Sequence, residues 1–136
     1  MDLEQARQFV RENHRAVLAT RRADGTLQMS PVAAAVDASG RLVVSSRETA
    51  YKTKNARRDP NVTICVFTDS FYGPWVQIDG TAEVIALPEA MDWLVEYYRS
   101  VSGEHPDWDE YRAAMEREQR VLFAVTIARA GPDRSG

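Results

Sequence analysis

Short runs of alternating or continuously apolar residues, separated by turn residues, dominate the chain and predict strands. Six strands are expected, at 14–22, 26–37, 41–46, 61–67, 75–86 and 121–128. Asp24-Gly25 is a strong hairpin signal between the first two. Pro31 predicts a bulge or an unpaired edge position, and Gly80 predicts a bulge or a sharp bend. The first three strands are expected to form a meander.

Four segments have the spacing or the capping residues of helices: 1–12, 50–58, 87–103 and 108–119. Asp59-Pro60 should end the second, Gly103 the third, and Asp107 should cap the fourth, with Glu110 as its capping-box partner. The tail 130–136 is expected to fray. Strands follow one another in adjacent runs rather than alternating singly with helices. The predicted fold is therefore mainly β (α+β): one domain over 1–136, a six-stranded antiparallel barrel with a few flanking helices.

Composition narrows the function classes. The 136 residues carry a net charge of −3, so the chain as a whole is not expected to coat nucleic acid or an anionic membrane. Its start is polar, and no apolar run is long enough to span a bilayer, so neither a signal peptide nor a membrane segment is predicted. Cys65 is the single cysteine and two histidines are present, too few for a structural zinc site; we expect a cytoplasmic protein without metal.

Positive charge is concentrated in the stretch SSRETAYKTKNARRDP, residues 45–60. The stretch contains two acidic residues, Glu48 and Asp59, and five cations: Arg47, Lys52, Lys54, Arg57 and Arg58. Lys52 and Lys54 are the only lysines of the chain. Serine hydroxyls from Ser45 and Ser46, free helix N–H groups and cationic side chains are what a phosphate site uses. The residues alone leave two interpretations equally open: an anion site, or a solvated helix face.

Other candidate chemistry is sparse. His14 and His105 are isolated, and His105 is expected to fix its loop; Cys65, between apolar neighbours, is expected to be a buried, inert thiol. No nucleophile–base order or nucleotide-binding glycine motif occurs, so the catalytic residues stay unknown. Trp93 and Tyr97, four apart and off the main apolar stripe of their helix, indicate a partner surface and make a homodimer reasonable.

Several segments together resemble a known family. The serine-ended strand, KTKNARRDP, VTICVF and WVQIDGTAEV are similar to the split β-barrel superfamily typified by pyridoxamine 5'-phosphate oxidase. RETAYKTKNARRDP together with YRSVSGEHPDWDEYRAAM resembles, more closely, its actinobacterial branch that uses the deazaflavin coenzyme F420. The resemblance covers residues 8 to 128. It implies a six-stranded split barrel, an intimate homodimer and a cofactor groove at the subunit interface.

The resemblance also implies a cofactor site. Lys52 would hold the cofactor phosphate. The chain segment Met29, Ser30, Pro31 and Val32 would line the ring with its backbone, and Trp75 and Gln77 lie on the strand that flanks it, from this chain or the second. Supporting positions near the phosphate or the anionic tail would be Ser45, Ser46, Lys54, Asn55 and Arg58. Two departures are Ala50, where several relatives have arginine, and the C-terminal AGPDRSG, which lacks an expected short motif.

The implied function is hydride transfer from reduced F420 to an electron-poor conjugated acceptor, such as an enone, quinone or tetrapyrrole. The longer, more negative tail of F420 suits five cations better than a single phosphate does. Two alternatives stay open: an FMN-dependent oxidase or flavin reductase on the same fold, and a non-catalytic cofactor-binding protein.

Overall fold

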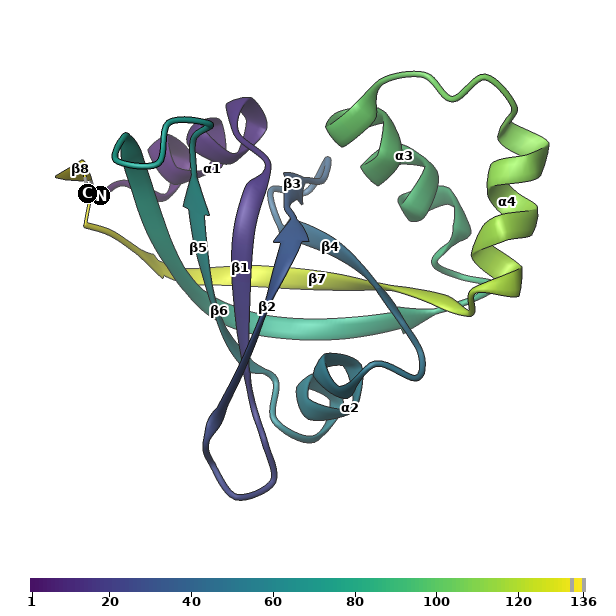
Figure 1. The fold of residues 1–136 in the computed structure, drawn as a ribbon, viewed down its shortest axis with the longest axis horizontal. Helices are drawn as coiled ribbons and strands as arrows, with labels where there is room; N and C mark the ends of the chain where they lie inside the picture. The colour runs from purple at the N-terminus through teal and green to yellow at the C-terminus, as the bar shows by residue number, and fades with distance from the viewer. Residues whose placement is uncertain (133, 136) are drawn as a thin grey trace.

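Eight strands form one antiparallel sheet in the computed structural model, which describes residues 1–132 and 134–135. The strands are β1 Arg15–Arg21, β2 Leu27–Ala33, β3 Ala35–Val36, β4 Leu42–Arg47, β5 Asn61–Phe67, β6 Pro74–Ala86, β7 Arg120–Ala130 and β8 Arg134–Ser135. Their order is β2-β1-β5-β6-β7-β4-β3, and β8 pairs with β6. The sheet curls so that β1, β2 and β5 cross the long strands β6 and β7, as Figure 1 shows. The split-barrel fold is confirmed.

The strand count differs from six for a physical reason. The predicted strand 26–37 is divided at Ala34: β2 pairs with β1, whereas β3 pairs with β4. β4 in turn pairs with β7, so the expected three-stranded meander is interrupted between β2 and β4. The tail differs as well, because Ala130 ends β7 and Arg134–Ser135 pair with β6, where fraying over 130–136 was expected. Residues 133 and 136 of that tail lie outside the described residues.

The four helices lie close to their predicted positions: α1 Leu3–Glu12, α2 Tyr51–Arg58, α3 Met91–Ser102 and α4 Trp108–Arg117. α2 ends at Asp59, and α3 ends at Gly103, whose φ of +83° suits glycine. Asp107 caps α4 by accepting from the Glu110 N–H. The capping-box role predicted for Glu110 is wrong, because its carboxylate accepts from Arg117 instead. In the described residues, no helix combines the length and apolarity needed to cross a bilayer.

Two apolar cores share strands β4 and β7. Inside the barrel, β7 contributes Val121, Phe123 and Val125; from its other face, Leu122 and Ala124 pack with α3 and α4. This double burial explains why the β7 sequence is continuously apolar rather than alternating. The insertion of α3 and α4 between β6 and β7 thus adds a second layer against one flank of the barrel, as Figure 1 shows.

Gly80 marks the predicted irregularity in β6. The register against β7 shifts between Asp79 and Gly80, and a Cβ atom at Gly80 would collide with the carbonyl oxygen of Thr126. Only glycine permits this close approach of two backbones. The bulge prediction is confirmed.

Candidate functional site

The outer edge of β2 is open where the sheet divides. The Ala34 N–H donates to the His14 carbonyl, so the backbone groups of Ser30 and Val32 point toward β1 and those of Met29, Pro31 and Ala33 point away from it. Pro31 has no N–H to donate, which is why it is tolerated at an edge. The expected unpaired edge position of Pro31 is confirmed.

One side chain bridges the division. The Tyr97 hydroxyl on α3 donates to the Ala33 carbonyl of β2 at 2.8 Å. Burial raises the pKa of Tyr97, and the backbone of Ser45 on β4 and the charge of Arg120 lower it. Tyr97 thus supplies a donor to a β2 carbonyl that points away from β1, on the side where β4 does not pair with β2. Tyr97 therefore has a role within the chain that its sequence-based assignment to a partner surface did not include, and that assignment stays a prediction.

The floor of the opening is the junction of β4 and α2. Thr53 is fully buried; its hydroxyl donates to the Arg47 carbonyl at 2.6 Å and lies 2.9 Å from the Ser46 hydroxyl. Ser46 is also buried. A cofactor phosphate would contact the Ser46 hydroxyl only if it entered the junction of β4 and α2. Ser45 is half-buried and faces α3, on the opposite face of β4.

Asn55 and Arg58 are tied to the barrel rather than free. Asn55 is buried, and its amide donates to the Thr20 hydroxyl at 3.2 Å. Arg58 donates to the Asn55 side-chain oxygen at 2.9 Å and to the Arg21 carbonyl at 3.0 Å. These contacts fix the orientation of α2 against β1. They occupy part of the donor capacity of Arg58, and the cofactor-supporting role of Asn55 stays a prediction.

Pairing within the protein reduces the five-cation cluster. Arg57 binds both carboxylate oxygens of Glu48, and Arg47 contacts Glu118 at 3.2 Å. Lys54 is exposed, with its ammonium 5.9 Å from the Tyr51 ring centroid. The charge argument for a long anion is therefore weaker than the sequence suggests, because two of the five cations are neutralised by carboxylates.

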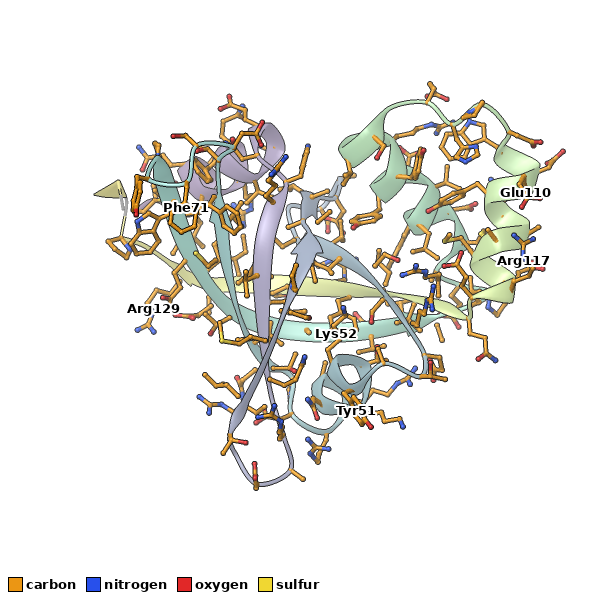
Figure 2. The ribbon with its side chains drawn as sticks, viewed as in Figure 1. Tyr51, Lys52, Phe71, Glu110, Arg117 and Arg129 are labelled. Carbon is orange, nitrogen blue, oxygen red and sulfur yellow. The ribbon has the colours of Figure 1, made fainter. Side chains whose placement is uncertain are left out.

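Lys52 is the cation that stands apart. It is half-buried, and no ion pair or hydrogen bond links it to another group in the part of the chain that the structure describes. Burial lowers its pKa, and the positive charge of Arg120 on β7 lowers it further. Figure 2 shows Lys52 on the side of α2 toward the sheet, with Tyr51 on the side away from it. An ammonium in these surroundings would be stabilised by an anion.

The predicted ring-binding residues lie on two faces of the sheet. Ser30 and Val32 point inward, and the Ser30 hydroxyl oxygen is buried with no hydrogen-bond partner among the described residues. Met29, 62% exposed, and Pro31 point outward. Trp75 and Gln77 share that outer face, but three strand spacings, about 14 Å, separate β6 from β2. Within one chain the structure does not bring these two pairs together.

Two pockets of the described residues lie beside this region. One of about 270 Å³ is enclosed by the β3–β4 turn and α3, and one of about 340 Å³ lies between α4 and the end of β6. Tyr97 lines the first and Arg120 the second, so both adjoin the opening without containing Lys52. Neither Tyr97 nor Arg120 was singled out from the sequence as a site residue. Two sequence signals could have indicated them: Arg120 stands at the start of a buried strand, and Tyr97 lies off the apolar stripe of its helix.

The remaining candidates have structural surroundings. His105 Nδ1 accepts from the Asp107 N–H at 2.9 Å, which confirms its loop-fixing role. His14 Nδ1 lies 2.8 Å from the Ala34 carbonyl. Cys65 is half-exposed on the outer sheet face rather than buried, and the pKa of its thiol is raised by desolvation, as for an unreactive thiol.

Comparison with known proteins gives one family and one fold. The family model described as pyridoxamine 5'-phosphate oxidase matches residues 3–131. A conserved hypothetical protein of Mycobacterium tuberculosis is 24% identical with a TM-score of 0.77, covering 96% of this chain and 82% of that one. An F420 reductase is 21% identical with a TM-score of 0.70, covering 91% and 94%. A FAD-binding protein of Mesorhizobium loti is 22% identical with a TM-score of 0.67, covering 96% and 92%.

Removing the bridging hydroxyl tests the division of the sheet. We expect Tyr97→Phe to lower the free energy of unfolding by about 1–3 kcal/mol, because it leaves the part-buried Ala33 carbonyl without its hydrogen-bond partner. Urea denaturation measures the loss. Tyr98→Phe is the matched control, since no hydrogen bond of the Tyr98 hydroxyl occurs in the described residues. Equal effects of the two variants would contradict the bridging role.

Replacing Lys52 by an apolar residue should not destabilise the protein. Because burial depresses its pKa, the unfolded chain binds the proton more tightly than the folded one, and stability should rise with pH as it nears the ordinary lysine pKa of 10.5. We expect Lys52→Met to keep or raise the melting temperature at pH 7 and to remove its contribution to that alkaline rise. Calorimetry at pH 7 and 9.5, with Lys54→Met as control, measures both. A drop of several degrees at pH 7 would reveal a structural partner.

Proposed function

The chain belongs to the pyridoxamine 5'-phosphate oxidase family, and we propose that it binds coenzyme F420 in the opening between β2 and β4. With the reduced coenzyme, it would transfer hydride to an electron-poor conjugated small molecule. One observation carries this proposal: Lys52, half-buried and without an anionic partner in the described residues, lies on the side of α2 toward the sheet.

The residues at the opening fit a phosphorylated, planar coenzyme. Lys52 would hold the phosphate, with Arg120 adding positive charge nearby. The Met29 N–H and the Pro31 carbonyl face away from β1 and could hydrogen-bond the polar edge of a ring system, and on the inner side the Ser30 hydroxyl has no partner among the described residues. Lys54, exposed at the next turn of α2, would meet the part of the coenzyme that extends into solvent. When bound, reduced F420 supplies the hydride.

The protein residues would orient the ring and exclude water rather than transfer protons. Tyr97 is the one phenol at the opening, and its hydroxyl already donates to Ala33. Desolvation raises the pKa of Tyr97, so the hydroxyl keeps its proton at neutral pH. Its proposed role is to hold β2 and β4 at the separation that the ring requires.

FMN is the second candidate, favoured by the charge pairing. Once Arg57 and Arg47 are neutralised, the remaining cations suit one phosphate as well as they suit a longer tail. The solved relatives include both an F420 reductase and a FAD-binding protein, at 21% and 22% identity. We prefer F420 because residues 47–60 and 98–115 resemble the F420-using branch of the family. A non-catalytic role would require that the protein binds the coenzyme without turnover.

A homodimer is part of the proposal. The outer face of the barrel carries exposed or half-exposed side chains, most of them apolar, on four adjacent strands: Leu27, Met29, Pro31, Val17, Cys65, Phe67 and Trp75. Apolar surface of this extent on one face favours burial against another protein. A second copy would also bring its own Trp75 and Gln77 to the groove, which the first copy cannot do across three strand spacings.

Fluorescence titration of the purified protein with F420 and with FMN, in parallel, tests the function. We expect tighter binding of F420. Lys52→Ala should weaken the preferred coenzyme at least tenfold, since one charge-assisted hydrogen bond contributes about 1.5–3 kcal/mol. Lys54→Ala, the exposed control on the same helix, should have a smaller effect. Unchanged affinity in Lys52→Ala would remove Lys52 from the site, and tighter FMN binding would select the second candidate.

Light scattering tests the assembly. We expect the mass of two chains in solution, and Leu27→Glu, which places a charge on the outer face, should shift the protein toward the monomer. Glu83→Gln is a suitable control, because Glu83 is exposed on β6 but is not one of these apolar positions and contacts Arg41 instead. A wild-type protein that stays monomeric at micromolar concentration would exclude a groove shared between chains.

A further inference from the structure

A separate pocket lies on the far side of Tyr97. It has a volume of about 270 Å³ and is enclosed by the β3–β4 turn on one side and α3 on the other. The residues that line it are Val36, Asp37, Ala38, Ser39, Arg41, Val43, Trp93, Glu96, Tyr97 and Ser100. From α3 these are positions 93, 96, 97 and 100, which share one helix face. Nothing in the coenzyme site accounts for this arrangement.

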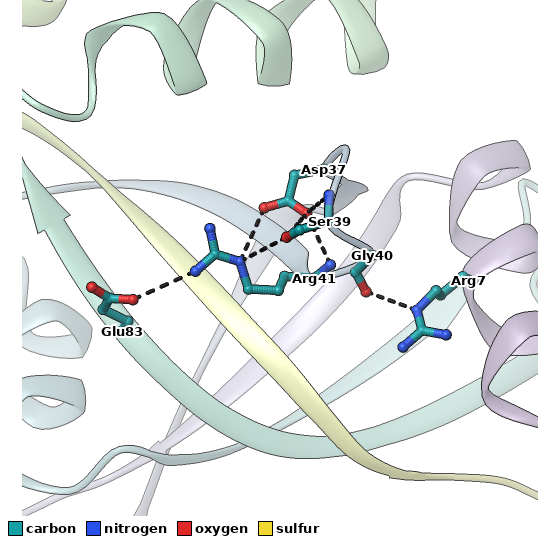
Figure 3. Close-up of polar contacts among 6 residues, drawn as sticks. All are labelled: Arg7, Asp37, Ser39, Gly40, Arg41 and Glu83. Atoms are coloured by element: carbon teal, nitrogen blue, oxygen red, sulfur yellow. Dashed lines mark hydrogen bonds and ion pairs between the residues drawn. The ribbon is translucent and has the colours of Figure 1, made fainter.

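The turn that forms one wall is held in place by a network of hydrogen bonds, drawn in Figure 3. One carboxylate oxygen of Asp37 accepts from the N–H groups of Ser39 and Arg41, and the other accepts from the Arg41 guanidinium at 3.1 Å. Arg41 also reaches Glu83 at 3.4 Å, and Arg7 on α1 donates to the Gly40 carbonyl at 2.8 Å. The pocket is therefore preformed, so a ligand would not have to order it.

The walls combine aromatic surface with charged groups that are already paired. Trp93 is 43% exposed, and the Arg41 guanidinium carbon lies 5.0 Å from its ring centroid. Of the two carboxylates at the pocket, Asp37 pairs with Arg41 at 3.1 Å and Glu96 pairs with Arg99 at 2.6 Å. Among the described residues that line the pocket, an anionic ligand would find no free cation, because the Arg41 guanidinium already contacts Asp37 and Glu83. A neutral ring meets no such penalty.

Tyr97 connects this pocket with the opening between β2 and β4. Its side chain lines the pocket, while its hydroxyl bonds to Ala33 at the end of β2. A ring placed along the β2 edge would therefore end next to the wall that Tyr97 forms. The two spaces are neighbours separated by one aromatic side chain.

We propose that the pocket between the β3–β4 turn and α3 binds a flat, uncharged ligand of one or two rings, which packs against Trp93 and Tyr97. Because the Tyr97 side chain separates this pocket from the proposed coenzyme opening, the ligand is assigned as one held beside the coenzyme and not as the acceptor in contact with its ring. The volume lies just below the usual range of ligand pockets and is too small for a four-ring ligand of the tetrapyrrole class. The pairing of Arg41 with Asp37 and Glu83 disfavours ligands that carry an acidic group.

Nuclear magnetic resonance of the tryptophan indoles tests the site without any coenzyme. The chain has three tryptophans, 75, 93 and 108, whose indole N–H signals can be assigned from Trp→Phe variants. Menadione, a neutral two-ring quinone, should shift the Trp93 signal saturably and leave Trp75 and Trp108 in place. The 2-naphthoate anion, of similar size, should bind at least tenfold more weakly.

A matched pair of variants locates the binding. Ser100→Phe fills the pocket from α3 and should abolish the menadione shift, whereas Ser102→Phe, exposed on the same helix and outside the lining, should leave it intact. Coenzyme affinity should be unchanged in both. The proposal is overturned if menadione leaves the Trp93 signal unmoved, if both variants behave alike, or if 2-naphthoate binds equally well.

The two proposals fail separately. A Trp93 shift in a protein that binds neither F420 nor FMN would keep the pocket and reject the coenzyme function. Coenzyme binding with menadione turnover, but no Trp93 shift, would keep the function and reject the pocket.

Discussion

A sheet that does not close must still satisfy its backbone hydrogen bonds, and this requirement shapes the molecule. β2 and β4 would be neighbours in a closed barrel, but they are not paired. Two side-chain hydroxyls from helices replace part of the missing ladder: Tyr97 serves the Ala33 carbonyl, and Thr53 serves the Arg47 carbonyl. Among the described residues, the Met29 N–H and the Pro31 carbonyl of β2 stay without a backbone partner. The division thus leaves polar backbone exposed at one defined place, where a ligand could use it.

The sequence predicts most of the elements because their signals are local. Alternating burial in β5, the Asp24-Gly25 turn and the glycine bulge at Gly80 each follow from a few neighbouring residues. The division at Ala34 has no such signal: Val32 to Val36 is an apolar run without a turn residue, and only the competing partners β1 and β4 decide where it bends. The contact of Tyr97 within the chain has no local signal either, since its partner is a carbonyl 64 residues away.

Charge is predictable as a sum but not as a pattern of pairs. The cations of residues 45–60 outnumber the nearby acids in the sequence, yet Glu118, which is distant in the chain, reaches Arg47 in the fold. Exposed ion pairs of this kind contribute about 0–1 kcal/mol to stability. At the candidate site, these ion pairs neutralise the arginines that could compete for an anion. The half-buried Lys52 is left as the distinctive positive charge. An arginine there would keep its proton under all conditions, whereas a desolvated lysine is sensitive to what binds it.

The position of α3 in the chain explains how one barrel could carry different ligand pockets. α3 and α4 are inserted between β6 and β7, whose ends stay paired at Ala86 and Val121. The barrel therefore does not depend on the length or surface of the insertion, except where Tyr97 holds the divided sheet. Trp93 and Ser100, on the same helix face as Tyr97, touch the pocket without this second duty. Substitution at these two positions can alter the pocket while the coenzyme opening keeps its width, whereas substitution at Tyr97 must alter both.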